Sequence, residues 1–185
     1  VEKVEEFRYL GSTVQSNGEC VREVKKRVQA GWSGWGRVIA GVICDRRVSV
    51  RGKGKVYRTV VRSEMLYRLD TVALSKTQEV ELEVAELKML RCSLGVTTMD
   101  RIRDEFIRGT VHVGHFGDKV REVRLRWFGH VQRRDMGFIS RRMLRMETPG
   151  RRTRGRPRRR FMDVVREDMQ VVGVKEADVQ DMVVW

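Results

Sequence analysis

Residues 75–95, SKTQEVELEVAELKMLRCSLG, carry the clearest structural signal in the chain. Ser75 with Gln78 three positions later is the pattern of a capping box, which opens a helix by satisfying two free backbone N–H groups. Gly95 is the residue type that most readily ends one, since it adopts a left-handed backbone without a steric penalty. The stretch predicts a helix to Leu94 whose inward residues are Val80, Val84, Leu87, Met89 and Leu90.

The same helix carries four glutamates, Glu79, Glu81, Glu83 and Glu86. We expect this acidic side to neutralise a neighbouring basic helix rather than to perform acid–base chemistry.

Helical spacing of apolar residues continues over most of the chain and predicts a mainly α fold. Further helices are expected at about residues 19–42, 55–69, 100–108, 118–134 and 161–172, and from residue 176 onward. Residues 7–14, FRYLGSTV, instead predict one short strand with a turn at Gly11 and Ser12. A single strand cannot satisfy its own backbone groups, so we expect it to pair with another part of a longer protein or to fray.

The composition limits the class of protein. Of the 185 residues, 41% are hydrophobic and 35% charged, which allows a core with large solvated faces. The three cysteines are far apart, which predicts a reducing location such as the nucleus or cytoplasm. No stretch approaches the roughly 18 apolar residues of a membrane span, so no membrane partner is expected. The first residue is Val1 rather than Met, which suggests a piece of a longer protein.

Positive charge is concentrated in residues 141–160, RRMLRMETPGRRTRGRPRRR. Ten arginines stand against one acid, Glu147, in a chain whose net charge is +14. Like charges repel, and Pro149 and Pro157 interrupt a helix, so the stretch is expected to be a solvated Arg-rich loop or linker. The planar guanidinium group grips phosphate from two sides, so RNA or DNA is the first partner to consider, with a solubilising or targeting role as the alternative.

Five motifs follow one another along the chain. They are FRYLGSTV at 7–14, EVKKRVQAGW at 23–32, KGKVYRTVVRSEMLYRLDTVAL at 53–74, LRWFGHVQRRD at 125–135 and GRPRRRFMDVVREDM at 155–169. In this order they resemble the C-terminal part of a non-LTR (LINE-type, RTE-like) retrotransposon reverse transcriptase, over essentially the whole chain.

The resemblance implies five segments: 1–18 as the end of a palm strand and its turn, 19–98 as a thumb-like helical bundle, 99–140 as a C-terminal helical region, 141–160 as the Arg-rich linker and 161–185 as terminal helices. Three positions depart from the family pattern. Ser63 stands where the family favours Pro, Arg68 where it favours Gly, and Phe161 where it usually has Trp.

The resemblance also exposes a chemical absence. The family's polymerase carries its catalytic carboxylates as an adjacent Asp-Asp pair, and this sequence contains no such pair. Two-metal phosphoryl transfer cannot be assembled without them. We therefore expect no catalytic residues and no enzyme activity in this chain, and no cofactor, with Mg²⁺ belonging only to the missing palm site.

The candidate nucleic-acid-binding residues form three basic sets. They are Arg22, Lys25, Lys26 and Arg27; then Arg124, Arg126, His130, Arg133 and Arg134; then Arg151, Arg152, Arg154, Arg156, Arg158, Arg159 and Arg160. A solvated helix face is the alternative for the first set, and a polar core contact for His130. We expect Trp32, Trp35, Trp127 and Phe128 to be buried rather than to stack on bases.

A metal site is not expected. Cys92, His112, His115 and His130 are the soft or imidazole ligands of one region, but their spacing matches no usual zinc pattern. The sequence therefore predicts a fragment that holds template RNA, primer DNA or their heteroduplex through phosphate contacts, together with the rest of a polymerase chain. The alternatives are a stand-alone basic helical RNA- or DNA-binding protein and a non-functional relic of a decayed element.

Overall fold

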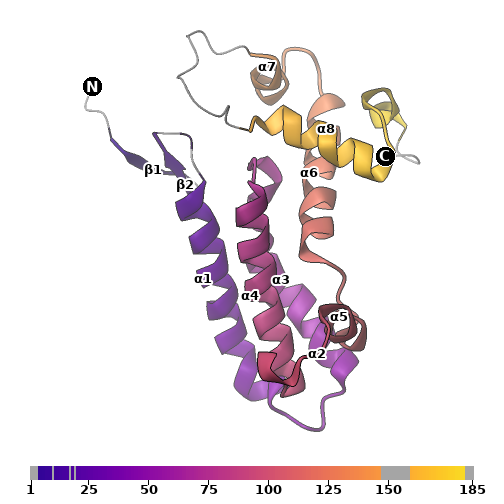
Figure 1. Ribbon diagram of the computed structural model, residues 1–185. Coiled ribbons are helices and arrows are strands. Elements are labelled where there is room, and N and C mark those ends of the chain that lie inside the picture. The colour runs from indigo at the N-terminus through magenta and orange to yellow at the C-terminus, as the bar shows by residue number, and fades with distance from the viewer. Residues whose placement is uncertain (1–3, 10, 17, 19, 147–158, 182–185) are drawn as a thin grey trace. The chain divides into compact units, whose positions relative to one another are not determined.

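The computed structural model describes residues 4–9, 11–16, 18, 20–146 and 159–181. Helices dominate these residues and the described strands form one small sheet near the N-terminus, which confirms the expectation of a mainly α fold (Figure 1). The chain divides into two compact units. Unit 1 comprises residues 1–68 and 74–119, and unit 2 comprises residues 69–73 and 120–185. The five-segment division remains a prediction.

The N-terminal segment of unit 1 is a hairpin, so the expectation of a single unpaired strand is corrected. Strand β1 (Glu6–Tyr9) pairs antiparallel with β2 (Ser12–Gln15), and Phe7 lies opposite Val14. The turn depends on Gly11, whose φ of +81° lies in the left-handed region that side chains disfavour. The segment thus finds its backbone partners within itself, one strand for the other.

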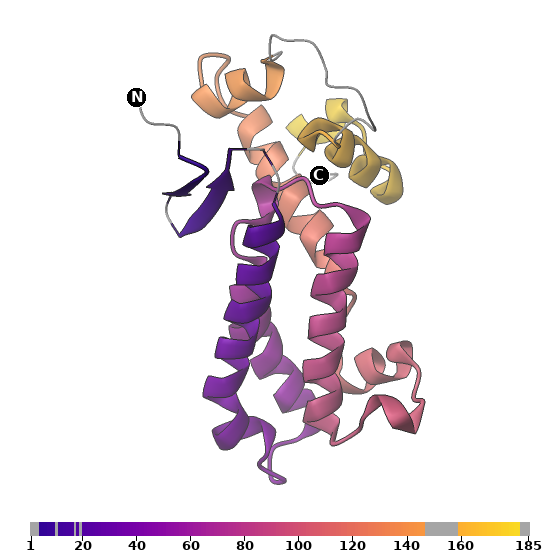
Figure 2. The ribbon, with the colours of Figure 1, turned by 60° about the vertical axis from the view of Figure 1, so that its left-hand side comes forward.

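Four helical stretches build most of unit 1. They are α1 (Val21–Val38) with its π-helical continuation η1 (Ile39–Ile43); α2 (Val50–Val56), the π-helical turn η2 (Tyr57–Val61) and α3 (Arg62–Leu66); α4 (Lys76–Leu94); and, after the short 3₁₀ turn η4 (Thr98–Asp100), α5 (Asp104–Val111). Helix α1 packs against α3 and α4, which run beside it in both views (Figures 1 and 2). At Gly31 a Cβ atom would lie 2.5 Å from Met65 Cγ, so this glycine permits the close approach of α1 and α3.

Trp35 of α1 is buried as expected, whereas Trp32 is 41% exposed, so the prediction that both tryptophans are buried is only half correct.

The helix expected at residues 55–69 begins earlier, at Val50, because the Ser49 hydroxyl accepts a hydrogen bond from the Gly52 N–H (3.1 Å). Its wider π turn brings Tyr57, Val61 and Arg62 to the buried side. Arg68, which stands where the resembled family favours Gly, has a φ of +58°.

Helix α4 begins and ends where its sequence predicts. Ser75 accepts a hydrogen bond from the Gln78 N–H (3.3 Å), its own N–H donates to Gln78 Oε1 (2.8 Å), and Gly95 ends the helix in a left-handed conformation. The inward face is different from the predicted one, since Val80 and Val84 are exposed while Met89 and Leu90 are buried. Its other buried residues are Leu82, Ala85, Glu86 and Ser93.

Glu86 is fully buried and joins three helical stretches of unit 1. Its Oε1 accepts hydrogen bonds from Arg62 Nη2 (2.6 Å) and Nε (3.0 Å) and from the Tyr57 hydroxyl (2.9 Å), while its Oε2 forms an ion pair with Arg108 of α5. Both arginines also donate to the Gly114 carbonyl, Arg62 at 2.5 Å and Arg108 at 3.3 Å. We call Tyr57, Arg62, Glu86 and Arg108 the Glu86 cluster. The expected neutralising role of a glutamate is thus seen for Glu86, but inside the core.

Unit 2 is built mainly from α6 (Phe116–Gln132, whose first residues belong to unit 1), α7 (Ile139–Arg145), α8 (Phe161–Val172) and the 3₁₀ turn η5 (Glu176–Gln180). Leu125 and Phe128 of α6 pack with Val165 and Met169 of α8. Helix α8 has the predicted bounds, and its last residue, Val172, is exposed. Helix α7 corrects the expectation of a loop over residues 141–145, because no Pro or Gly occurs there. Residues 147–158 of the Arg-rich stretch lie outside the described residues.

Replacing the buried carboxylate tests the role of the Glu86 cluster. Glu86→Gln keeps the side-chain shape but leaves two buried guanidinium groups without a counter-charge, so we expect the free energy of unfolding to fall by about 3–5 kcal/mol. Urea denaturation followed by circular dichroism measures it. Glu81→Gln, an exposed change on the same helix, is the control and should stay within about 0.5 kcal/mol of the parent. Equal effects of the two substitutions would contradict the assignment.

Alkaline titration tests the Tyr57 environment. Burial, followed by the nearby Glu86 charge, raises the pKa of Tyr57 well above its ordinary value of 10.0. Because the folded state favours the neutral phenol, its contribution to stability is complete below about pH 10 and is lost as the pH rises further. We expect absorbance at 295 nm to show the ionisation of Tyr57 as a late step, which coincides with unfolding. Tyr57→Phe should remove that late step, and a late step that survives would contradict the prediction.

Candidate nucleic-acid interface

The first basic set lies at the start of α1, beside the hairpin. Arg22 is exposed and forms an ion pair with Glu6 of β1, and Lys25 is exposed. Lys26 is half-buried and donates to the Thr13 hydroxyl of β2. Three of the four predicted cations therefore reach solvent.

Arg27, the fourth member, is held inside unit 1. Its Nε lies 3.0 Å from Glu23 Oε1, and its guanidinium carbon lies 5.2 Å from the centroid of the Tyr67 ring. Glu23 Oε2 in turn accepts a hydrogen bond from the Thr13 N–H (2.7 Å). Arg27 thus ties α1 to the hairpin and to Tyr67, and its charge is not offered to a phosphate.

The hairpin adds a cation that sequence reasoning missed. Arg8 of β1 lies opposite Thr13 and lines a hollow of about 300 Å³ with Arg22 and Lys26, alongside Glu6. The alternation of polar and apolar residues along FRYLGSTV could have placed Arg8 on the same side as Thr13, but only once a hairpin rather than a single strand had been assumed.

The second basic set, on α6, contains one core residue and a row of exposed ones. Arg124 is 1% exposed, and its Nη1 lies 2.5 Å from Asp168 Oδ2 of α8. Arg126 is exposed and pairs with Glu122, His130 is exposed, and exposed Arg134 places its guanidinium carbon 5.7 Å from the Phe138 ring centroid. Residues 126, 130 and 134 are four apart, so they share one face of the α6 helix or its end. His130 therefore belongs to the exposed surface rather than to the core.

Arg133 has a structural contact, because its Nη1 donates to the Val179 carbonyl (2.9 Å). Helix α7 adds two exposed cations that the candidate set did not include, Arg142 and Arg145. Arg141 donates to the Arg134 carbonyl. The amphipathic pattern ISRRMLR could have revealed these residues, had the helix been recognised before the proline-containing part of the stretch.

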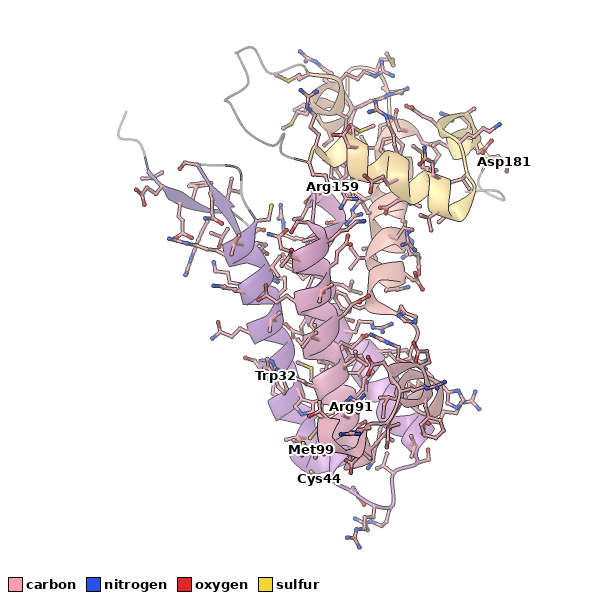
Figure 3. All side chains as sticks on the ribbon, in the orientation of Figure 1. Trp32, Cys44, Arg91, Met99, Arg159 and Asp181 are labelled. Carbon is pink, nitrogen blue, oxygen red and sulfur yellow. The ribbon has the colours of Figure 1, made fainter. Side chains whose placement is uncertain are left out.

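The third set is only partly described. Arg151, Arg152, Arg154, Arg156 and Arg158 lie outside the described residues. Arg159, at the N-terminal end of α8 (Figure 3), forms an ion pair with Glu167, and Arg160 is exposed. The Arg160 backbone N–H donates to Asp163 Oδ2 (3.2 Å), which caps α8.

A further basic loop lies at the end of unit 1 near Cys44 (Figure 3). Arg46 and Arg51 are exposed there. Arg47 is 92% exposed in its side chain but pairs with Asp45, and this hydrogen-bonded arginine holds the pKa of Asp45 below its ordinary value. One of the loop's cations is therefore partly neutralised locally.

Other kinds of site find no support within the described parts of the chain. No group of three or more His, Cys, Asp or Glu side chains there could hold a metal ion, and Cys92, His112, His115 and His130 do not assemble into one. No helix among the described residues is long and apolar enough to cross a membrane. What the exposed side chains offer is positive charge on helical faces, which is suited to phosphate contact.

Comparison with known proteins gives one weak similarity, which covers the whole of this chain but only part of the relative. The chain is 23% identical over 192 aligned residues to an uncharacterized transposon-derived protein of Caenorhabditis elegans, covering 100% of this chain and 66% of that protein. The similarity indicates a transposon-related protein. No family model matches the chain. No solved structure matches it either.

Two arginines of α6 allow stability and binding to be tested separately, because Arg124 is buried and Arg126 is exposed. Arg124→Gln leaves Asp168 buried with only the longer ion pair to Arg121 (3.6 Å), so we expect a loss of about 3 kcal/mol in the free energy of unfolding. Arg126→Gln should leave stability unchanged but lower affinity for any nucleic acid and reduce its salt slope by about one. Thermal melts and fluorescence anisotropy measure the two effects. If Arg124→Gln were as stable as the parent and bound more weakly than Arg126→Gln, the assignment would be reversed.

Proposed function

We propose that this chain is the nucleic-acid-binding part of a non-LTR retrotransposon RNA-directed DNA polymerase. It comprises the end of the palm, the thumb and a basic tail. Its role is to hold template RNA and primer DNA through phosphate contacts. The chemistry belongs to catalytic carboxylates outside this sequence, so the chain alone neither polymerises nor cuts.

The similarity to a transposon-derived protein over the whole chain is the observation that carries the proposal. The five motifs, in their order from FRYLGSTV to GRPRRRFMDVVREDM, narrow that origin to a reverse transcriptase by resemblance. The relative is described only as transposon-derived, so the assignment to a reverse transcriptase rests on the motifs.

The distribution of charge supports phosphate binding. After the internally paired Arg27 and Arg124 are set aside, exposed cations remain on the start of α1, along α6 and on α7. The exposed arginines of unit 2 include Arg126, Arg134, Arg142, Arg145, Arg160 and Arg166, and exposed His130 lies beside them on α6. Arginine on rigid helices suits phosphate because the planar guanidinium group presents two parallel N–H donors.

Salt dependence of binding tests the proposal. If about five phosphates are neutralised, the logarithm of the association constant should fall against the logarithm of salt concentration with a slope of roughly −3.5 for single strands to −4.5 for duplexes. Filter-binding titrations with an RNA–DNA heteroduplex, at several salt concentrations, provide the measurement. Absence of binding at low salt would refute the proposal.

A variant of the Arg-rich stretch tests the same proposal through the salt dependence of binding. Changing Arg151, Arg152, Arg154 and Arg156 together to Gln should weaken binding equally for unrelated sequences and make the slope shallower, since phosphate contacts carry no sequence information. A loss confined to one sequence would mean that the stretch reads bases instead.

A further inference from the structure

Unit 2 contains a groove of about 490 Å³ between α7, the first turns of α8 and the η5 turn. Apolar side chains from two of these elements line it, Met143 and Leu144 from α7 and Phe161 and Met162 from α8. Its volume falls within the range of pockets that hold small organic groups.

The apolar part of the groove contains a fixed aromatic ring beside exposed methionines. Phe161 is half-buried, and its ring meets that of Trp127 edge to face, with centroids 5.5 Å apart at 90°. This contact holds the orientation of the Phe161 ring. Met143 and Met146 are 63% and 72% exposed, so they add apolar surface that a ligand in the groove would cover.

The rim of the groove is cationic. Arg145, Arg160 and Arg166 line it from α7 and α8, and all three residues are exposed. Arg166 Nη1 lies 3.4 Å from Asp163 Oδ1, a long contact that leaves most of its donors available. The rim therefore favours an anionic occupant, and its charge disfavours a second copy of this chain.

Polar acceptors line the groove beside the apolar surface. Gln132 is 7% exposed, and its Nε2 lies 3.4 Å from Glu176 Oε1. Asp163 and Glu176 also line the groove, and their carboxylates can accept hydrogen bonds from the N–H groups of a base edge, such as N3–H of uracil. Recognition of an unpaired nucleotide needs an aromatic face for the base, polar groups for the base edge and cations for the phosphates. The groove offers all three.

We propose that this groove binds an unpaired nucleotide of a single-stranded nucleic acid, with the base on Phe161 and the flanking phosphates at Arg145, Arg160 and Arg166. A duplex cannot use the site in this way, because its bases are stacked and paired. The inference rests on the proposed nucleic-acid binding and adds to it a preference for single strands that contain bases.

The test compares a 12-residue deoxyuridine strand with a 12-residue abasic strand, which keeps the phosphates and removes the bases. Fluorescence anisotropy is measured on the full chain at constant salt. We expect the deoxyuridine strand to bind about tenfold more tightly, which is the usual effect of stacking one base. Phe161→Leu, which keeps an apolar side chain but removes the aromatic face, should abolish this difference and leave the affinity for the abasic strand unchanged.

Phe106→Leu is the matched control, because Phe106 is a 65% exposed phenylalanine on α5 of unit 1, outside the groove. It should retain the tenfold difference. Equal binding of the two strands by the parent chain would overturn the groove assignment while leaving phosphate binding intact. Loss of the difference in Phe106→Leu rather than Phe161→Leu would also overturn it, and binding of neither strand at low salt would refute the proposed function as well.

Crosslinking of the unaltered chain keeps the test decisive even if Phe161→Leu fails to fold. A strand containing one 5-iodouridine is irradiated in complex with the protein, and the adduct is mapped by mass spectrometry. Adducts on peptides containing Phe161 or Met143 support the groove. Adducts confined to residues 20–119 overturn it.

Discussion

The two oxygens of one buried carboxylate hold unit 1 together. Glu86 of α4 receives Tyr57 and Arg62 on one oxygen and Arg108 on the other, so stretches distant in the sequence must meet at one point. Charged groups are costly to remove from water, and this cost is offset because the carboxylate accepts from both guanidinium groups and the phenol, while both guanidinium groups also donate to the Gly114 carbonyl. Among the described residues, the buried Arg108 Nε is left without a hydrogen-bond partner. The π-helical turn at Tyr57–Val61, which brings both Tyr57 and Arg62 to the buried side, is the local consequence.

Arginine occupies two environments in this chain. Arg27, Arg62, Arg108 and Arg124 are buried against carboxylates, whereas Arg126, Arg142 and Arg145 are exposed. The planar group with five donors suits a carboxylate in the core and would suit a phosphate under the proposed function, since the two present similar oxygens. The net charge of +14 therefore does not show which cations are available to a nucleic acid. The exposed rows on α6 and α7 are the better measure of the surface that the proposed function needs.

The sequence predicts that the candidate site consists of basic residues on helices, but it identifies only some of the residues that are exposed. Arg22, Lys25, Arg126 and Arg134 are exposed, because helical spacing assigns them to the side opposite the apolar residues, and their binding of nucleic acid stays a prediction. Arg27 and Arg124 were not recognised as core residues, since their partners Glu23 and Asp168 look like ordinary surface charges in the sequence. The groove around Phe161 could not be foreseen, because it requires α7 and α8 to be brought together.

The sequence by itself determined the features that depend on local interactions. These are the start of α4 at Ser75, its end at Gly95 and the bounds of α8. Each depends on contacts between residues at most a few positions apart, so the pattern is visible in the printed chain. Tertiary structure decided that Val80 faces solvent while Glu86 is buried, and that Arg62, Arg108 and Arg124 serve the core. These outcomes depend on partners tens of residues away, and burial converts a surface charge into a structural one only when such a partner is present.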